Sequence, residues 1–142
     1  MDRVILREKL ESLRRCITRV QQKIPDSVAA LEADADTQDI IVLNLTRAVQ
    51  VCVDLGTHII SDTNEPAPQS MGEVFETLER LGVISHATAL ALRKAVGFRN
   101  IAVHSYQAIN WAIVYSISDS HLEDFRHFAI EISARFLEVD RH

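Results

Sequence analysis

The sequence contains few of the residues that interrupt helices or separate short strands. Its 142 residues include four glycines, three prolines and 6% aromatic side chains. Because glycine and proline mark turns and strand ends, their scarcity argues against a sheet-rich or loop-rich fold. With 47% hydrophobic and 25% charged residues, the chain is expected to form a single domain over residues 1–142.

Cysteine is equally scarce. Cys16 and Cys52 are far apart and outside any CxxC spacing. A chain of this length buries enough apolar surface to fold without crosslinks, so we expect both thiols to be reduced and buried as small apolar groups. Charged residues such as Asp2 and Arg3 interrupt any hydrophobic segment after Met1. These features favour a cytoplasmic protein with no membrane partner.

Several enzyme signatures are missing. The sequence has no glycine-rich phosphate loop, no Gly-x-Ser-x-Gly turn and no His-Glu-x-x-His pair. His121 and His127 lie on different faces of a helix and miss the spacing of a helical zinc site. We therefore expect neither a metal nor a cofactor. The net charge of −5 argues against a protein that coats nucleic acid, although a few local arginines suffice to bind one phosphate.

Apolar residues recur at helical spacing along most of the chain. A first helix carries one apolar stripe over residues 6–24 and ends at Pro25. After an Ala/Asp-rich connection, a second helix over about residues 37–60 is apolar on several faces, which favours a central position in a bundle. Residues 61–70 contain two prolines and form the longest predicted loop.

The second half of the chain continues the same pattern. Met71 begins a shorter helix, Gly82 is placed as its C-terminal cap, and Ser85 is placed as the N-cap of the next helix. A last long helix is predicted from about Asn110 onward. The predicted fold class is therefore all-α, an antiparallel up-and-down bundle of four to five helices.

The segment GFRNIAVHSY, residues 97–106, gathers chemically active side chains in an otherwise apolar stretch. They are Arg99, Asn100, His104 and Tyr106. On one helix, Asn100 and His104 share a face, whereas Arg99 and His104 differ by about 140° around the axis. Either the helix ends near His104, or another element or a second copy of the chain completes the pocket.

This segment resembles the HepT group of the HEPN superfamily, a superfamily of small helical-bundle ribonucleases. Arg99, His104 and Tyr106 match the R-x4-H-x-Y signature, and Asn100 matches the asparagine that follows the arginine. Chain length, helix number and motif position are similar over most of the chain. The resemblance implies a HEPN-like bundle and a toxin of a type II toxin–antitoxin system that cleaves RNA without a metal ion.

The motif residues suit this chemistry. A ribose 2′-hydroxyl that attacks the adjacent phosphate needs a base, an acid for the leaving oxygen and a cation for the developing charge. His104 titrates in the useful range, Arg99 binds phosphate, and Asn100 can orient His104. Since each chain carries one motif histidine, we expect a homodimer whose shared cleft supplies acid and base together, as in HEPN ribonucleases. The alternative for His104 is a buried histidine bonded to a neighbouring helix.

The resemblance also implies a partner. HepT toxins are typically paired with an MntA-type nucleotidyltransferase antitoxin that transfers AMP to the motif tyrosine, here Tyr106. An anionic adduct there would fill the cleft and compete with RNA for Arg99. The chain lacks the transferase's own signature, so it is expected to be the modified partner, either as a homodimer or within a larger hetero-oligomer. The alternative is a non-catalytic helical binding module that docks a nucleotidyltransferase and presents substrate to it.

Further charged residues lie outside the motif. Arg47, Asp54 and His58 share one face of the central helix, and we expect Arg47 and Asp54 to support the active-site cleft. The alternatives are a solvated strip or an ion pair between Arg47 and Asp54. The first helix carries a basic stretch that either contributes to RNA binding or is a solvated face: Arg3, Arg7, Arg14, Arg15 and Arg19. Three carboxylates lie around the start of the next helix, where they complement its dipole: Asp34, Asp36 and Asp39.

Overall fold

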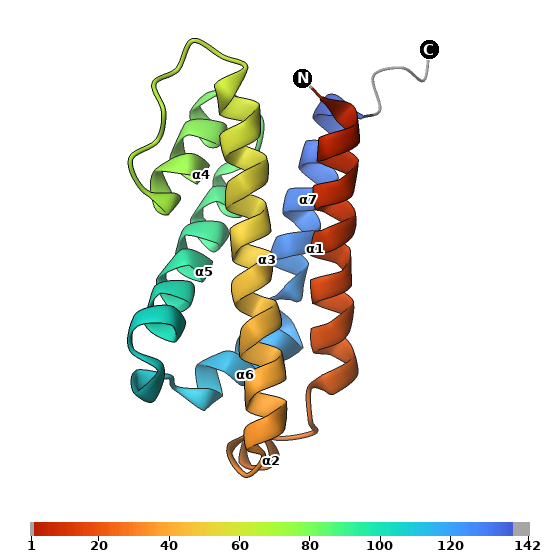
Figure 1. Ribbon diagram of the computed structural model, residues 1–142, viewed down its shortest axis with the longest axis vertical. Coiled ribbons are helices and arrows are strands. Elements are labelled where there is room, and N and C mark those ends of the chain that lie inside the picture. Colours follow the sequence, from red (N-terminus) through yellow and green to blue (C-terminus); the bar gives the residue numbers. More distant parts are fainter. Residues whose placement is uncertain (1, 138–142) are drawn as a thin grey trace.

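Helices account for all the regular secondary structure over residues 2–137, the part of the chain that this computed structural model describes (Figure 1). In chain order they are α1 (Arg3–Lys23), α2 (Val28–Glu32), α3 (Ala35–Ser61), α4 (Met71–Arg80), α5 (His86–His104), the 3-10 helix η1 (Tyr106–Ala108), α6 (Trp111–Ser120) and α7 (Leu122–Phe136). The predicted all-α bundle is confirmed. Helices α1, α3, α4, α5 and α7 form its antiparallel body, and α2 and α6 lie together at one end.

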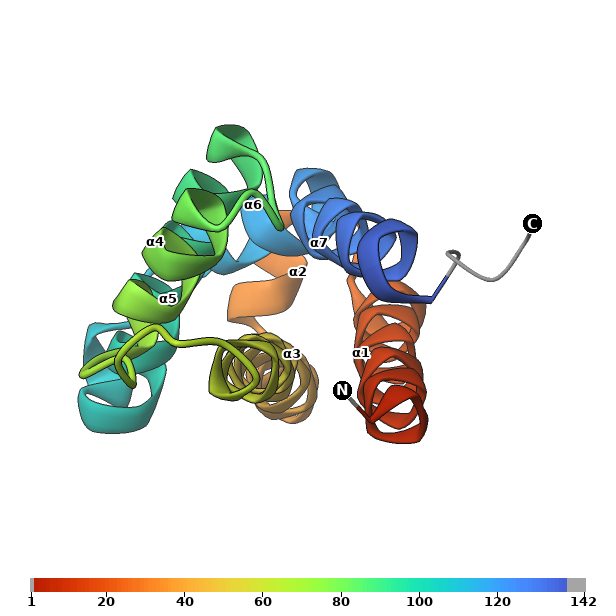
Figure 2. The same ribbon diagram turned by 90° about the horizontal axis from the view of Figure 1, so that it is seen from above.

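Helix α3 has helices on several sides, as its apolar composition predicts, but one of its faces is left open to solvent. It packs against α1 on one side and against α4 and α5 on the other (Figure 2). By length and composition α3 could cross a membrane, but 61% of its most apolar window is buried inside the bundle. Its apolar character is therefore that of a core helix.

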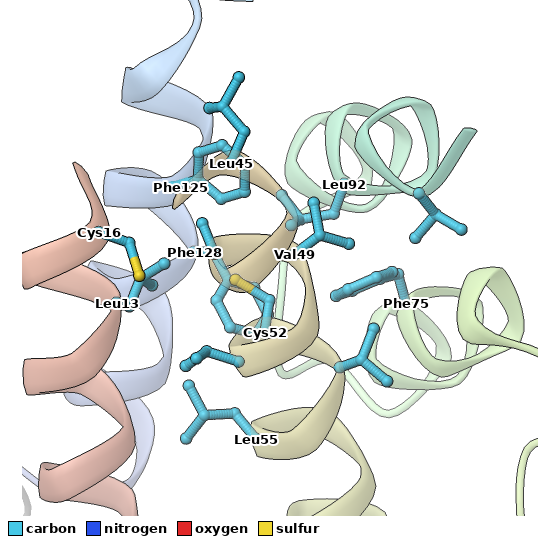
Figure 3. Close-up of a cluster of buried hydrophobic side chains, with 14 of the residues drawn as sticks. Leu13, Cys16, Leu45, Val49, Cys52, Leu55, Phe75, Leu92, Phe125 and Phe128 are labelled. Atoms are coloured by element: carbon cyan, nitrogen blue, oxygen red, sulfur yellow. The ribbon is translucent and has the colours of Figure 1, made fainter. Parts of the chain in front are cut away.

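The core joins α3 to the helices around it (Figure 3). The rings of Phe75 on α4 and Phe128 on α7 meet edge to face, with their centroids 5.9 Å apart. Such pairs contribute about 0.5–1.5 kcal/mol beyond the area they bury. Cys16 and Cys52 are both buried and free, as predicted, and burial raises the pKa of each thiol.

Most predicted helix ends are confirmed by their caps. Helix α1 ends at Lys23, shortly before Pro25. The Ser85 hydroxyl accepts a hydrogen bond from the Thr88 amide at 3.2 Å and caps α5. Gly82 follows α4 with a φ of +75°, a left-handed conformation that glycine adopts without the steric cost of a Cβ.

The single long helix predicted from Asn110 is wrong. The chain leaves the helix at His121, where φ is −117° and ψ is 11°, and this break separates α6 from α7. The preceding residues, Ser118 to Ser120, have polar side chains that compete with backbone hydrogen bonds, and the Ser118 hydroxyl donates to the Val114 carbonyl at 2.8 Å. This break, together with the unpredicted α2, raises the count to seven α-helices over residues 2–137.

Candidate active site

The motif lies where α5 ends. Ser105 leaves the helix, with a φ of −147° and a ψ of 56°, although its amide still donates to the Ile101 carbonyl at 2.8 Å. The short η1 follows, and the Asn110 side chain then caps α6. Of the two arrangements left open by the sequence, the helix therefore does end at His104. Tyr106 consequently belongs to a different element from the other three motif residues.

The last turns of α5 carry the other three motif side chains. Arg99 is half-buried, whereas Asn100 and His104 are exposed. The Arg99 guanidinium donates a long hydrogen bond, 3.4 Å from Nη1 to the Oδ1 atom of Asn100. The alternative of a buried His104 is therefore wrong, because its imidazole is open to a ligand.

Tyr106 is anchored to the beginning of the central helix. Its hydroxyl donates a hydrogen bond of 2.8 Å to Oδ1 of Asp39 on α3, and its ring meets Trp111 edge to face with centroids 6.1 Å apart. Burial, the hydrogen bond to Asp39 and the negative charge of Asp39, in that order, raise the pKa of Tyr106 to about 12. The hydroxyl therefore stays protonated at neutral pH.

Asp39 is the site residue that sequence reasoning assigned to another role. Asp34 does cap α3, accepting from the Thr37 amide at 3.2 Å, and Asp36 lies in the first helical turn, as expected for carboxylates at a helix start. Asp39 lies one turn further along and bonds Tyr106 instead, across 67 positions of sequence. No local pattern marks that contact.

The polar row on α3 is divided. Asp54 accepts a hydrogen bond from Gln50 at 2.9 Å and lies 3.4 Å from the Lys9 ammonium on α1, so the alternative of an ion pair with Arg47 is wrong. At 1.5 Å per residue, Asp54 is about 22 Å along α3 from Asp39, well away from the motif. His58 is half-buried, and its Nε2 has no hydrogen-bond partner within residues 2–137.

Two cavities lie near the motif without containing it. One, of about 580 Å³, is a groove between α1 and α3 with Arg47 in its wall. The other, of about 710 Å³, is largely apolar and is bordered by Phe98, Ile101 and Ile113. None of the four motif side chains lines either cavity. In one chain, the motif therefore lies on an open surface.

Metal-ligating side chains are dispersed in the part of the chain that the structure describes. Among residues 2–137, no group of three or more His, Cys, Asp or Glu side chains is arranged to hold a metal ion. His121 is instead 3.6 Å from the Asp124 carboxylate.

Known proteins are similar to this chain in sequence and in fold. A family model described as ribonuclease HepT-like matches residues 13–132. The mRNA nuclease HepT of Shewanella oneidensis is 38% identical over 130 residues, which cover 92% of this chain and 97% of that protein.

Solved structures show the same likeness. The tri-AMPylated HEPN toxin of Shewanella oneidensis, solved in complex with its MNT antitoxin, is 37% identical with a TM-score of 0.87, and the match covers 94% of this chain and 99% of that one. The cytosolic protein YutE of Bacillus subtilis, of unknown function, shares the fold at 16% identity and a TM-score of 0.80, over 97% of this chain and 92% of that one. With the family model matched over most of its length, the chain belongs to the ribonuclease HepT-like family.

Proposed function

We propose that this protein is an endoribonuclease toxin that cleaves RNA without a metal ion, and that a nucleotidyltransferase antitoxin neutralises it by adding AMP to Tyr106. The observation that carries the proposal is the exposed pair of Asn100 and His104 beside Arg99 at the end of α5, in a chain of this family. We infer a cytoplasmic location, in line with the related cytosolic protein and with the burial of α3 in the bundle.

In the proposed reaction the ribose 2′-hydroxyl attacks the neighbouring phosphorus. His104 takes the hydroxyl proton, Arg99 stabilises the negative charge that develops on the phosphate oxygens, and Asn100 binds the phosphate or orients the imidazole. The departing 5′-oxygen needs a proton from a second acid. One chain offers one motif histidine, so we assign that role to His104 of a second copy.

The surface around the motif supports such a homodimer. Ile101 and Val103 are 45% and 50% exposed beside the motif and offer apolar surface that a second copy could bury. Subunit exchange tests the shared cleft. If both histidines are needed, mixing wild type with an equal amount of His104→Ala should lower the activity per wild-type chain by about half at random pairing. Unchanged activity per wild-type chain would show that each subunit works alone.

The contact between Tyr106 and Asp39 supports the proposed modification. The Tyr106 oxygen attacks the α-phosphorus of ATP supplied by the antitoxin, pyrophosphate leaves, and the hydroxyl proton must be accepted by a base. Asp39 already accepts a hydrogen bond from that hydroxyl and is the acceptor we assign. The adduct would add negative charge near Arg99 and compete with RNA there.

Cleavage of RNA in EDTA tests the enzyme assignment. His104→Ala should abolish cleavage, because it removes the group that takes the 2′-hydroxyl proton in the proposed reaction. His127→Ala is the matched control, since His127 is also exposed but lies on α7, outside the motif. Equal cleavage by wild type and His104→Ala would overturn the catalytic assignment.

Mass spectrometry after coexpression with the antitoxin tests the modification. AMP should be added to the wild-type chain and absent from Tyr106→Phe. An adduct that persists in the phenylalanine variant would place the modification on another residue.

A further inference from the structure

The groove between α1 and α3 concentrates positive charge. Arg15 and Arg19, one turn apart on α1, face Arg47 on α3 across it. Burial raises the pKa of the Cys16 thiol, and the positive charges of Arg47 and Arg15 both lower it. Both guanidinium groups are therefore close enough to this thiol, at the base of the groove, to act on it. We name this feature the arginine groove; its lining is Ser12, Arg15, Cys16, Arg19, Ile40, Leu43, Asn44 and Arg47.

The arginines of the groove differ from several other arginines of the surface. Arg14, Arg80 and Arg126 form ion pairs with Glu11, Glu65 and Glu123. Over residues 2–137, no carboxylate forms an ion pair with an arginine of the groove. Three like charges in one groove of an acidic protein repel one another unless an anionic ligand neutralises them.

The groove is continuous with the motif along the exposed face of α3. Asp39, which bonds Tyr106, is followed at intervals of four residues by Leu43 and Arg47, both of which line the groove. From Asp39 to Arg47 the helix rises about 12 Å. Leu43 is 47% exposed on this path. A strand bound at the motif therefore reaches the groove by crossing two turns of one helix.

The chemistry of the groove fits ribonucleotides. Guanidinium groups bind phosphate oxygens through paired hydrogen bonds. The Asn44 amide donates to the Ile40 carbonyl at 2.8 Å and keeps its oxygen as an acceptor, and the apolar edge formed by Ile40 and Leu43 can take the face of a base. An extended chain of phosphates matches three separated arginines better than one small anion does.

We propose that the arginine groove binds the sugar–phosphate backbone of the RNA substrate next to the bond that is cleaved. The inference rests on the proposed ribonuclease function and adds a subsite to it. Arg15, Arg19 and Arg47 hold phosphates on one side of the motif, so that Arg99 and His104 meet the strand in a fixed register.

Salt-dependent RNA binding tests the groove. The full chain is titrated with a fluorescent 20-nucleotide RNA whose 2′-hydroxyls are methylated, so that it binds without being cut. The groove variant combines Arg15→Ala, Arg19→Ala and Arg47→Ala. The matched control combines Arg14→Ala, Arg80→Ala and Arg126→Ala, which changes the net charge equally, from −5 to −8, away from the groove.

The expected result is a change in the slope of log affinity against log salt concentration. Each single-strand phosphate contact contributes about 0.7 to that slope, so the groove variant should lose about 2 and the control almost nothing. Equal slopes in the groove variant and the wild type would overturn the proposal, as would equal losses in the two variants. Loss of antitoxin binding with an unchanged RNA slope would identify a protein-docking surface instead.

The proposal about the groove and the proposal of ribonuclease activity can be refuted separately. A wild type that cleaves RNA through His104, together with a groove variant of unchanged slope, refutes the groove alone. A wild type that does not cleave refutes the ribonuclease function, while the slope measured with uncleavable RNA still decides whether the groove binds the backbone.

Discussion

Replacing Asp39 by asparagine should lower the pKa of Tyr106 from about 12 toward the ordinary value of 10.0. The substitution removes the negative charge beside the phenol and weakens the hydrogen bond that holds its proton. Burial is the largest cause of the shift and is unchanged by the substitution. The expected fall is therefore partial and ends between 10 and 12.

The change is measurable by the ultraviolet absorbance of tyrosinate. The chain has two tyrosines, so a Tyr115→Phe background leaves Tyr106 as the single chromophore of this kind. At pH 11, a phenol with a pKa of 12 is about one-tenth ionised, and one with a pKa of 11 is about half ionised. Circular dichroism at each pH verifies that the helices remain formed.

Asp36→Asn is the matched control, because Asp36 is an exposed carboxylate of the same helix and the hydroxyl of Tyr106 bonds Asp39 instead. It should leave the titration of Tyr106 nearly unchanged. If Tyr106 titrates in Asp39→Asn as it does in the wild type, the hydrogen bond to Asp39 does not raise the pKa of the phenol. If both variants shift equally, the cause is the general field of the acidic helix start.

The raised pKa of Tyr106 also makes the free energy of unfolding depend on pH. Since the pKa of Tyr106 is higher in the folded chain than in the unfolded chain, the unfolded chain loses this proton first as pH rises. The contribution of neutral Tyr106 to folding is complete below about pH 10 and is lost as the pH rises through 12. In Asp39→Asn this loss of stability should be complete at a lower pH, because the pKa of Tyr106 in the folded chain is lower.

Three substitutions test the packing that holds the motif in place. Gly56→Ala should destabilise the fold by about 1–3 kcal/mol, because an added Cβ would overlap Val74 and come within 3.0 Å of Leu78. An unchanged midpoint of urea denaturation would contradict this close contact of α3 with α4. Gly97→Ala meets open space in α5 and should instead raise the unfolding free energy by about 0.5–1 kcal/mol. Ser85→Ala removes the cap of α5 and should cost about 1 kcal/mol in the same denaturation assay.

The sequence was informative about the fold wherever the signal is local. Apolar spacing located the long helices, and Gly82 and Ser85 marked the turn between α4 and α5 because each residue has a specific backbone or capping role. The break at His121 was not predicted, since the apolar spacing continues from α6 into α7 and outweighed the polar side chains of Ser118 to Ser120, which precede the break.

The candidate site shows the same limit. The motif could be predicted because its residues lie within eight positions of one another, and α5 carries three of them on its last turns. Asp39 could not, because an exposed carboxylate near a helix start has an ordinary explanation and its contact with Tyr106 arises only from tertiary packing. Arg47 was singled out with Asp54, yet its neighbours across the groove are arginines of α1.

The distribution of arginine accounts for how an acidic chain can act on an anionic substrate. Several exposed arginines pair with local glutamates and present little net field to solvent. Within residues 2–137, the arginines of the groove form no ion pair with a carboxylate, and Arg99 bonds the neutral amide of Asn100. With a net charge of −5, much of the remaining surface repels phosphate, so the proposed RNA binding is favoured where these arginines gather. The two proposals together predict that RNA strands reaching both the groove and the motif bind most strongly.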